Sequence, residues 1–152
     1  MTAEARIKQD FKKNMPEFIV MHWDGKLIKY QHRRETDERL AVVASFPRPD
    51  HTHQFLAAPC IPNGTGASMR DALMETIRVW EIPHNSIIGM SWDTTASNTG
   101  QLRGSSTVFE QEMGRGLLWL ACRHHMGELH VKHADIEARG AWNGKFKTVN
   151  SN

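Results

Sequence analysis

Two aspartates, Asp24 and Asp93, each follow a short apolar run of the sequence. Residues 18–23 read FIVMHW before Asp24, and residues 87–92 read IIGMSW before Asp93. After Asp93 the residues become small and polar (TTASNTG), which is typical of a loop that leaves the end of a buried strand. A carboxylate in that place can bind Mg²⁺, because hard cations prefer oxygen ligands, or it can begin a turn by accepting hydrogen bonds from nearby backbone N–H groups. The spacing alone leaves both interpretations of Asp93 open.

The elements that must position these aspartates follow from similar patterns. Apolar runs predict strands at residues 39–46, 54–61 and 117–122, and the Asp24 run either continues through Gly25 or turns there. Pro59 within the third strand predicts the edge of a sheet, since proline cannot donate a ladder hydrogen bond. Apolar residues at helical spacing predict three helices, at residues 68–82, 107–113 and 125–139.

The helix at 68–82 has the clearest boundaries. Ser68 is its predicted cap, with Asp71 three residues later, and Pro83 ends it. The resulting order is three strands followed by alternating helices and strands, which predicts an α/β protein with a five-stranded mixed sheet.

This order is that of the ribonuclease H-like fold. In that fold the first and fourth strands are parallel neighbours, about 4.8 Å apart, so Asp24 and Asp93 are expected to be adjacent. Two adjacent carboxylates repel each other unless a cation neutralises them, which favours a site for Mg²⁺ or Mn²⁺.

Length and composition are consistent with one intracellular domain. The chain has 152 residues and a formal net charge of +2, which neither requires nor excludes a nucleic-acid partner. Cys60 and Cys122 lie far apart and no secretory signal precedes them, so we expect reduced thiols. No apolar run approaches the roughly 20 residues of a membrane span. Residues 1–14 are charged and fit either a short helix or a frayed arm. We divide the chain into a flexible N-terminal arm at residues 1–15, the ribonuclease H-like domain at 16–140 and a loose tail at 141–152.

The segments WDGK (23–26), WDTTASNTG (92–100) and LLWLACRHH (117–125) together resemble the catalytic domain of DNA transposases of the hAT type. The resemblance spans about Phe18 to Val131 and implies a domain that cuts and joins DNA, in the nucleus, with divalent metals held by two aspartates and a glutamate. Asp24 and Asp93 match the two aspartates.

The third of these segments contains a Cys-x-x-His motif, Cys122 to His125, which such transposases also carry. The resemblance implies that Cys122 and His125 lie near the scissile phosphate and that His125 contacts it. Arg123, inside the motif, is the further candidate for a phosphate contact.

The sequence departs from the transposase pattern in one respect that bears on activity. In the family the third acidic residue follows a long helical insertion, and this chain ends at Asn152 before such a segment. We therefore expect a truncated remnant without activity, or alternatively a non-catalytic module that binds nucleic acid or protein. Glu75, on the helix at 68–82, is the weaker candidate for a third ligand, since helix glutamates are usually solvated.

Two other clusters have ordinary structural explanations. Cys122-x-x-His125 fits half of a zinc site, but the second half-site is missing, so we do not expect zinc. Trp23, Trp92 and Trp119 each lie in a predicted strand; stacking on a flipped base is the alternative, but the alternation of side chains along a strand favours packing in the core.

Overall fold

The computed structural model describes residues 2–29, 36–49, 53–93 and 95–121. Four α-helices and five strands make up this part of the chain, together with one short 3₁₀ helix at His84–Ser86. The helices are α1 (Ala3–Lys13), α2 (Gly66–Val79), α3 (Ala96–Thr99) and α4 (Ser105–Met113). The strands are β1 (Ile19–Lys29), β2 (Thr36–Ser45), β3 (His53–Ala57), β4 (Ile87–Trp92) and β5 (Leu118–Ala121).

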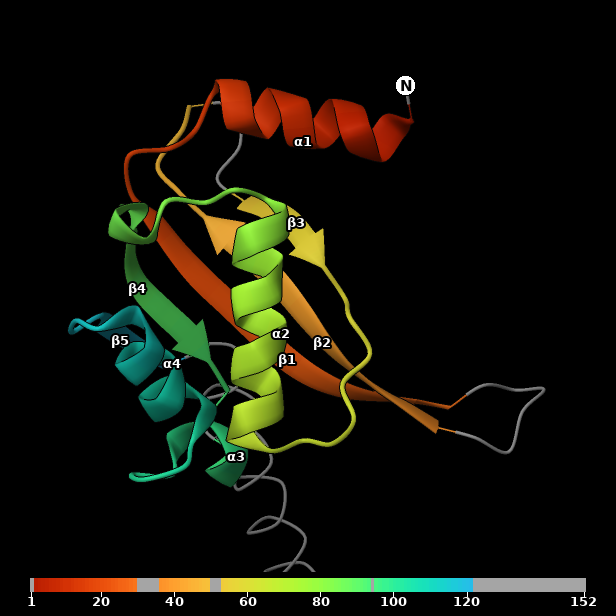
Figure 1. Cartoon of the computed structure of the whole chain (residues 1–152), viewed down its shortest axis with the longest axis vertical. Coiled ribbons are helices and arrows are strands. Elements are labelled where there is room, and N and C mark those ends of the chain that lie inside the picture. The colour runs from red at the N-terminus through yellow and green to blue at the C-terminus, as the bar shows by residue number, and fades with distance from the viewer. Residues whose placement is uncertain (1, 30–35, 50–52, 94, 122–152) are drawn as a thin grey trace, which may run out of the picture.

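The strands form one sheet in the order β3-β2-β1-β4-β5. The first three strands make an antiparallel meander, and β4 and β5 are parallel to β1 (Figure 1). A mixed sheet of this order, with helices in the crossovers after β3 and β4, is the ribonuclease H-like topology. The predicted fold class is therefore confirmed. The third strand lies at the edge of the sheet, as predicted, but β3 ends at Ala57, so Pro59 is not within it.

β1 is the longest strand and runs without a turn through Gly25. Its residues alternate between the two faces of the sheet, as strand geometry requires. Ile19, Met21 and Trp23 are almost fully buried, whereas His22 and Asp24 lie on the opposite face and are only partly buried. This alternation places the first aspartate outside the main core.

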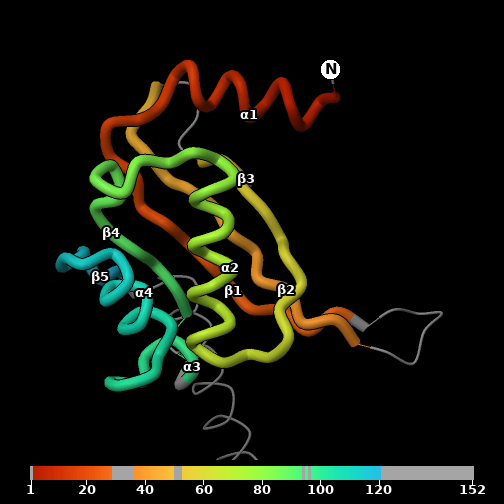
Figure 2. The backbone as a smooth tube through the Cα atoms, viewed as in Figure 1, coloured from red at the N-terminus to blue at the C-terminus, as the bar shows by residue number. Residues whose placement is uncertain are grey.

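The main core lies between the sheet and helices α2 and α4. Figure 2 shows α2 crossing β1 and β2, with α4 beside it next to β4 and β5. Met69, Leu73 and Ile77 form the buried stripe of α2, at the spacing that the sequence predicts. The cap differs from the prediction: Thr65, not Ser68, precedes the first turn, and its hydroxyl accepts from the Ser68 backbone N–H at 3.4 Å.

The N-terminal residues form a helix in place of the flexible arm that we expected. α1 is capped by Thr2 and packs on the core through Phe11. The Phe11 ring lies 5.8 Å from the Phe46 ring and 5.4 Å from the Trp80 ring, between centroids. The polar sequence of α1 conceals this, because Phe11 is the one residue of the helix that is buried.

The last predicted helix, at 125–139, and the tail at 141–152 lie outside the described residues. None of the described helices has the length and apolar character needed to cross a bilayer.

Candidate metal and nucleic-acid site

The register between β1 and β4 places the two predicted aspartates next to each other. Trp23 of β1 pairs with Trp92 of β4 in parallel register, and each aspartate is the next residue of its chain segment. β4 ends at Trp92, so Asp93 lies just beyond the carboxyl end of that strand. Open α/β sheets commonly bind ligands at this edge. Asp24 and Asp93 are called the aspartate pair below.

Asp24 lies on the face of the sheet opposite helices α2 and α4. In the antiparallel pairing of β1 with β2, Asp24 lies opposite Ala41. The carboxylate Oδ2 lies 2.9 Å from Lys26 Nζ, and 43% of the side chain is exposed. An ion pair this exposed contributes little to stability and is readily exchanged for another cation.

Asp93 is held by the loop that follows it. Its Oδ1 accepts from the Thr95 backbone N–H at 3.3 Å, from the Thr95 hydroxyl at 2.7 Å, and from the Asn98 side-chain amide. This is the turn interpretation of Asp93, and it occupies one oxygen only. The second oxygen, Oδ2, has no hydrogen-bond partner among the described residues. The turn therefore fixes the carboxylate and leaves an oxygen for a ligand.

Asn98 is the residue that links this carboxylate to the core, and sequence reasoning missed it. It is 2% exposed, and its Oδ1 accepts from the Trp23 indole N–H at 3.0 Å and from the Ser105 hydroxyl at 2.6 Å. The Trp23 indole also donates to Ser105 Oγ at 3.0 Å. The Asn98 amide group thus connects β1, α4 and Asp93. The small polar run after Asp93 was its signal in the sequence, but only the fold shows which member is buried.

His22 is a second residue that the sequence did not single out. It precedes Asp24 by two positions in β1, and its partner in β4 is Ser91. Burial lowers the pKa of His22 below its usual value, and the charge of the nearby His53 lowers this pKa further. The imidazole is therefore neutral near neutral pH. Its Nε2 atom is buried and has no hydrogen-bond partner within the described part of the chain.

A small cavity of about 170 Å³ lies beside these groups. Its lining combines polar side chains from β1 and β4 with apolar side chains from β2 and the tryptophans. It is called the aspartate pocket below. The residues that line it are His22, Trp23, Asp24, Ala41, Val43, Ser91, Trp92 and Asp93.

The tryptophans next to the aspartates pack in the core. Trp23 and Trp92 are 3% and 4% exposed, which excludes them as platforms for a base. Their rings stack at 5.5 Å between centroids, and Trp92 meets Trp119 edge-on at 5.3 Å. Trp119 is 47% exposed, and its indole donates to Glu110 Oε1 at 3.0 Å. Core packing, as predicted, accounts for Trp23 and Trp92.

Glu75 does not join the aspartate pair. It lies on the outer side of α2, where its two oxygens accept from Arg78 at 2.6 and 2.7 Å. Hydrogen bonding to Arg78 lowers the pKa of Glu75. Within residues 2–29, 36–49, 53–93 and 95–121, no group of three His, Cys, Asp or Glu side chains converges. The remaining predicted site residues, Cys122, Arg123 and His125, lie outside the described residues.

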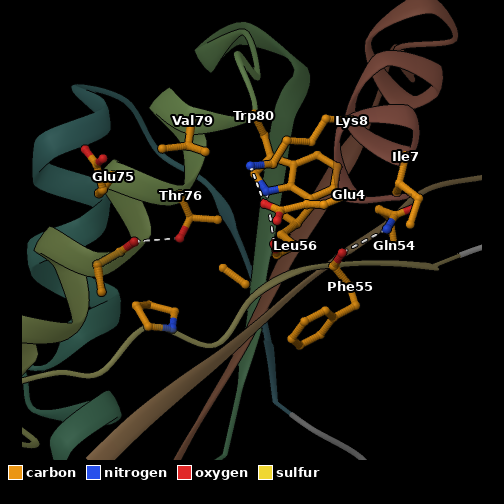
Figure 3. Close-up of a pocket in the computed structure, with 13 residues that line it drawn as sticks. Glu4, Ile7, Lys8, Gln54, Phe55, Leu56, Glu75, Thr76, Val79 and Trp80 are labelled. Carbon is orange, nitrogen blue, oxygen red and sulfur yellow. Dashed lines mark hydrogen bonds and ion pairs between the residues drawn. The ribbon is translucent and has the colours of Figure 1, made fainter. Parts of the chain in front are cut away.

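A larger hollow of about 680 Å³ lies between α1, β3 and α2 (Figure 3). We call it the apolar groove; Ile7, Phe55 and Val79, which are 41 to 57% exposed, give it its apolar character. Its polar groups are paired with each other. The Trp80 indole donates to the Leu56 carbonyl at 3.0 Å, and Glu4 forms an ion pair with Lys8 at 2.9 Å.

Comparison with known proteins leaves the family open. No family model matches the chain, and no curated protein sequence matches it. Among solved structures, the HTLV-2 integrase catalytic core domain, in complex with magnesium and in a trimeric form, is similar with a TM-score of 0.43 and 12% identity. That similarity covers 81% of this chain and 68% of the integrase chain. The fold class of the present chain rests on its own strand order and register.

Proposed function

We propose that this chain is a transposase- or nuclease-like domain that holds Mg²⁺ or Mn²⁺ through Asp24 and Asp93 and acts on the phosphodiester backbone of DNA. The register of β1 with β4 carries this proposal, because it places the two aspartates side by side where the parallel pairing of these strands ends, at Trp23 and Trp92. Their free oxygens are hard ligands of the kind that these cations prefer. When bound, the cation would supply charge stabilisation for phosphoryl transfer.

The chain's own groups would prepare such a site in three ways. The Thr95 and Asn98 hydrogen bonds orient Asp93, and the Lys26 ion pair holds the Asp24 carboxylate where it is partly open to solvent. The stacked Trp23 and Trp92 rings fill the space behind the pair with apolar atoms. These contacts favour a fixed pair of oxygens, which is what a cation with strict coordination geometry requires.

Turnover is a separate question from metal binding. No group of three His, Cys, Asp or Glu side chains that could hold a metal converges within the described residues, and inactivity of the chain stays a prediction. β5 is parallel to β4 and ends at Ala121, opposite Trp92, so the chain leaves this strand at the edge that carries the aspartates. The carboxylates that follow in the sequence, Glu128, Asp135 and Glu137, are the ones to test for a further ligand.

The first experiment is titration of the purified chain with Mg²⁺ and Mn²⁺ by calorimetry. We expect binding by the wild type and none by Asp24→Asn or Asp93→Asn, because each substitution removes one of two charges. Glu75→Gln is the matched control, since it removes an exposed carboxylate that lies away from the pair. Equal binding by all four proteins would contradict the proposal.

The second experiment asks whether the bound metal does chemistry. Nicking of supercoiled plasmid in Mn²⁺, lost in Asp24→Asn, would show an active nuclease and would overturn our expectation of inactivity. In that case Gln or Asn substitution of the three carboxylates after β5 would identify the additional ligand. No nicking with intact metal binding would support the inactive form.

The second candidate function is a non-catalytic nucleic-acid-binding module, and the lack of a third converging group in the described residues favours it. Both candidates predict DNA binding that weakens as salt rises, because phosphate contacts release counterions. They differ in metal dependence. A non-catalytic module would bind DNA equally well with and without Mg²⁺ and in the Asp24→Asn variant.

The hAT resemblance and a nuclear location stay predictions. They rest on the three sequence segments that were quoted for them.

A further inference from the structure

The apolar groove is bordered by exposed apolar side chains from three separate elements. Ile7 of α1, Phe55 of β3 and Val79 of α2 are 48%, 57% and 41% exposed, and all three line the groove (Figure 3). Single apolar residues are normal at a protein surface, but these three border one hollow of about 680 Å³. Sites for small molecules typically have volumes of about 300–1,000 Å³, so the groove has the size of such a site.

The uncharged polar side chains of the lining donate to backbone carbonyls. Gln54 Nε2 donates to the Phe55 carbonyl at 2.8 Å, and the Thr76 hydroxyl donates to the Ala72 carbonyl at 2.7 Å. The Trp80 indole N–H likewise donates to a carbonyl of β3. A ligand gains no hydrogen bond from these donors unless an existing bond breaks, which offsets the gain.

The charged side chains of the lining are paired in the same way. Glu4 forms an ion pair with Lys8 at 2.9 Å, and the Lys8 ammonium lies 5.6 Å from the centre of the Trp80 ring. Glu75 accepts from Arg78 at 2.6 and 2.7 Å. A charged ligand would lose hydration in the groove without meeting an unmatched charge of opposite sign in the lining, and that loss is costly. The occupant that fits is therefore uncharged and mainly apolar.

The extent of the groove favours a small molecule over a folded protein partner. A standard protein–protein interface takes about 20–30 residues from each side, whereas 13 residues line this groove. Leu56, Thr76 and Trp80 among them are almost fully buried already. The exposed apolar side chains of the three walls would still stabilise a complex with a small apolar ligand, because removal of apolar surface from water is favourable.

We propose that the apolar groove is a binding site for an uncharged, apolar small molecule, with α1, β3 and α2 as its walls. Ile7, Phe55 and Val79 contact this ligand. The edge-on contact of Trp80 with Phe11 holds α1 in place as one wall. The groove shares no lining residue with the aspartate pocket, so the inference is independent of the proposed function.

The test uses two fluorescent dyes that share an aromatic skeleton and differ in charge. Phenylnaphthylamine is uncharged, and anilinonaphthalenesulfonate adds a sulfonate to the same rings. Fluorescence titration of the purified chain should show saturable, one-to-one binding of the uncharged dye. The sulfonate should bind at least about tenfold more weakly, because its charge is desolvated without a partner.

Substitutions in two different walls locate the bound dye. Val79→Asn places an amide at a position that is already 41% exposed, and we expect the affinity for the uncharged dye to fall about tenfold, since apolar contact is lost. Ile7→Gln makes the corresponding change in α1, with the same expected result. Leu102→Asn is the matched control, because Leu102 is 84% exposed and does not line the groove.

Circular dichroism and urea denaturation establish that each variant is folded before titration, and either wall variant alone carries the comparison with Leu102→Asn. Equal affinity for the uncharged dye in wild type, Val79→Asn and Ile7→Gln would overturn the inference, and so would equal affinity of the wild type for the two dyes. If the groove instead holds a second copy of the chain, sedimentation will show a dimer that Val79→Asn dissociates, without saturable dye binding. That result would also overturn the inference.

Discussion

The two ends of α2 have opposite characters, and the contrast shows where this molecule keeps unsatisfied polar groups. At the N-terminal end, Gly66 lies so close to Gly104 and Ser105 that a side chain there would clash with backbone, and Ser105 leads through Asn98 to Asp93. At the C-terminal end, Trp80 packs on Phe11 and borders the apolar groove.

The aspartate pocket and the apolar groove also differ in their hydrogen bonding. Around the larger apolar groove the polar groups pair with each other, as Trp80 does with Leu56 and Glu4 with Lys8. The aspartate pocket is smaller, yet it contains a buried imidazole nitrogen without a partner and a carboxylate oxygen that the loop leaves open. Cavity volume alone would favour the apolar groove over the aspartate pocket. Metal binding and catalysis, however, need polar atoms that the fold orients but leaves without hydrogen-bond partners.

The largest effect on stability should come from the groove end. Trp80→Ala removes an aromatic side chain that is 6% exposed, together with its hydrogen bond to Leu56, and we expect a loss of about 3–5 kcal/mol in the free energy of unfolding. Urea denaturation measures it, with Val79→Ala as a mild neighbouring control. Mg²⁺ affinity of the folded fraction should not change; a parallel loss would show that the two ends are coupled through α2.

Substitution of Asn98 should affect both stability and metal binding. Asn98→Ala removes hydrogen bonds to Trp23, Ser105 and Asp93, and we expect a loss of about 2–3 kcal/mol because buried partners are left unpaired. Asp93 also loses its orientation, so Mg²⁺ binding should weaken. Ser97→Ala, at an exposed neighbouring position, is the control. Destabilisation with unchanged metal affinity would show that the loop does not orient the carboxylate.

Asp24→Asn should abolish Mg²⁺ binding with little effect on stability, which is the reverse of the result expected for Trp80→Ala. The side chain is nearly half exposed, so the free energy of unfolding should change by no more than about 0.5 kcal/mol. Calorimetric Mg²⁺ binding should nevertheless be lost. If chemical denaturation instead shows a large stability change, Asp24 has a structural role and the contrast between the two ends weakens.

Glu75→Gln should have the smallest effect of all. The carboxylate is exposed and paired with Arg78 on the solvent side of α2, and exposed pairs of this kind contribute little. We expect no measurable change in thermal melting or in Mg²⁺ binding. Loss of Mg²⁺ binding would restore Glu75 as a ligand.

The local patterns of the sequence determined the order of strands and the fold class. Apolar runs, a β-branched stretch and Pro59 are features of neighbouring residues, and strand formation depends mainly on such local features. The same locality explains the errors. Thr65 rather than Ser68 caps α2, and α1 packs through Phe11 on Phe46 and Trp80, which are distant in the sequence.

By itself the sequence determined that Asp24 and Asp93 each end an apolar run, since that is a matter of adjacent residues. Only the tertiary structure decided that these runs are parallel neighbours with Trp23 opposite Trp92. It also decided that Asn98 is buried, that Glu75 faces away and that His22 shares the pocket. Register and burial arise from contacts between residues that are far apart in the chain. Trp23 and Asn98, for example, are separated by 75 positions, and no short-range pattern encodes such a contact.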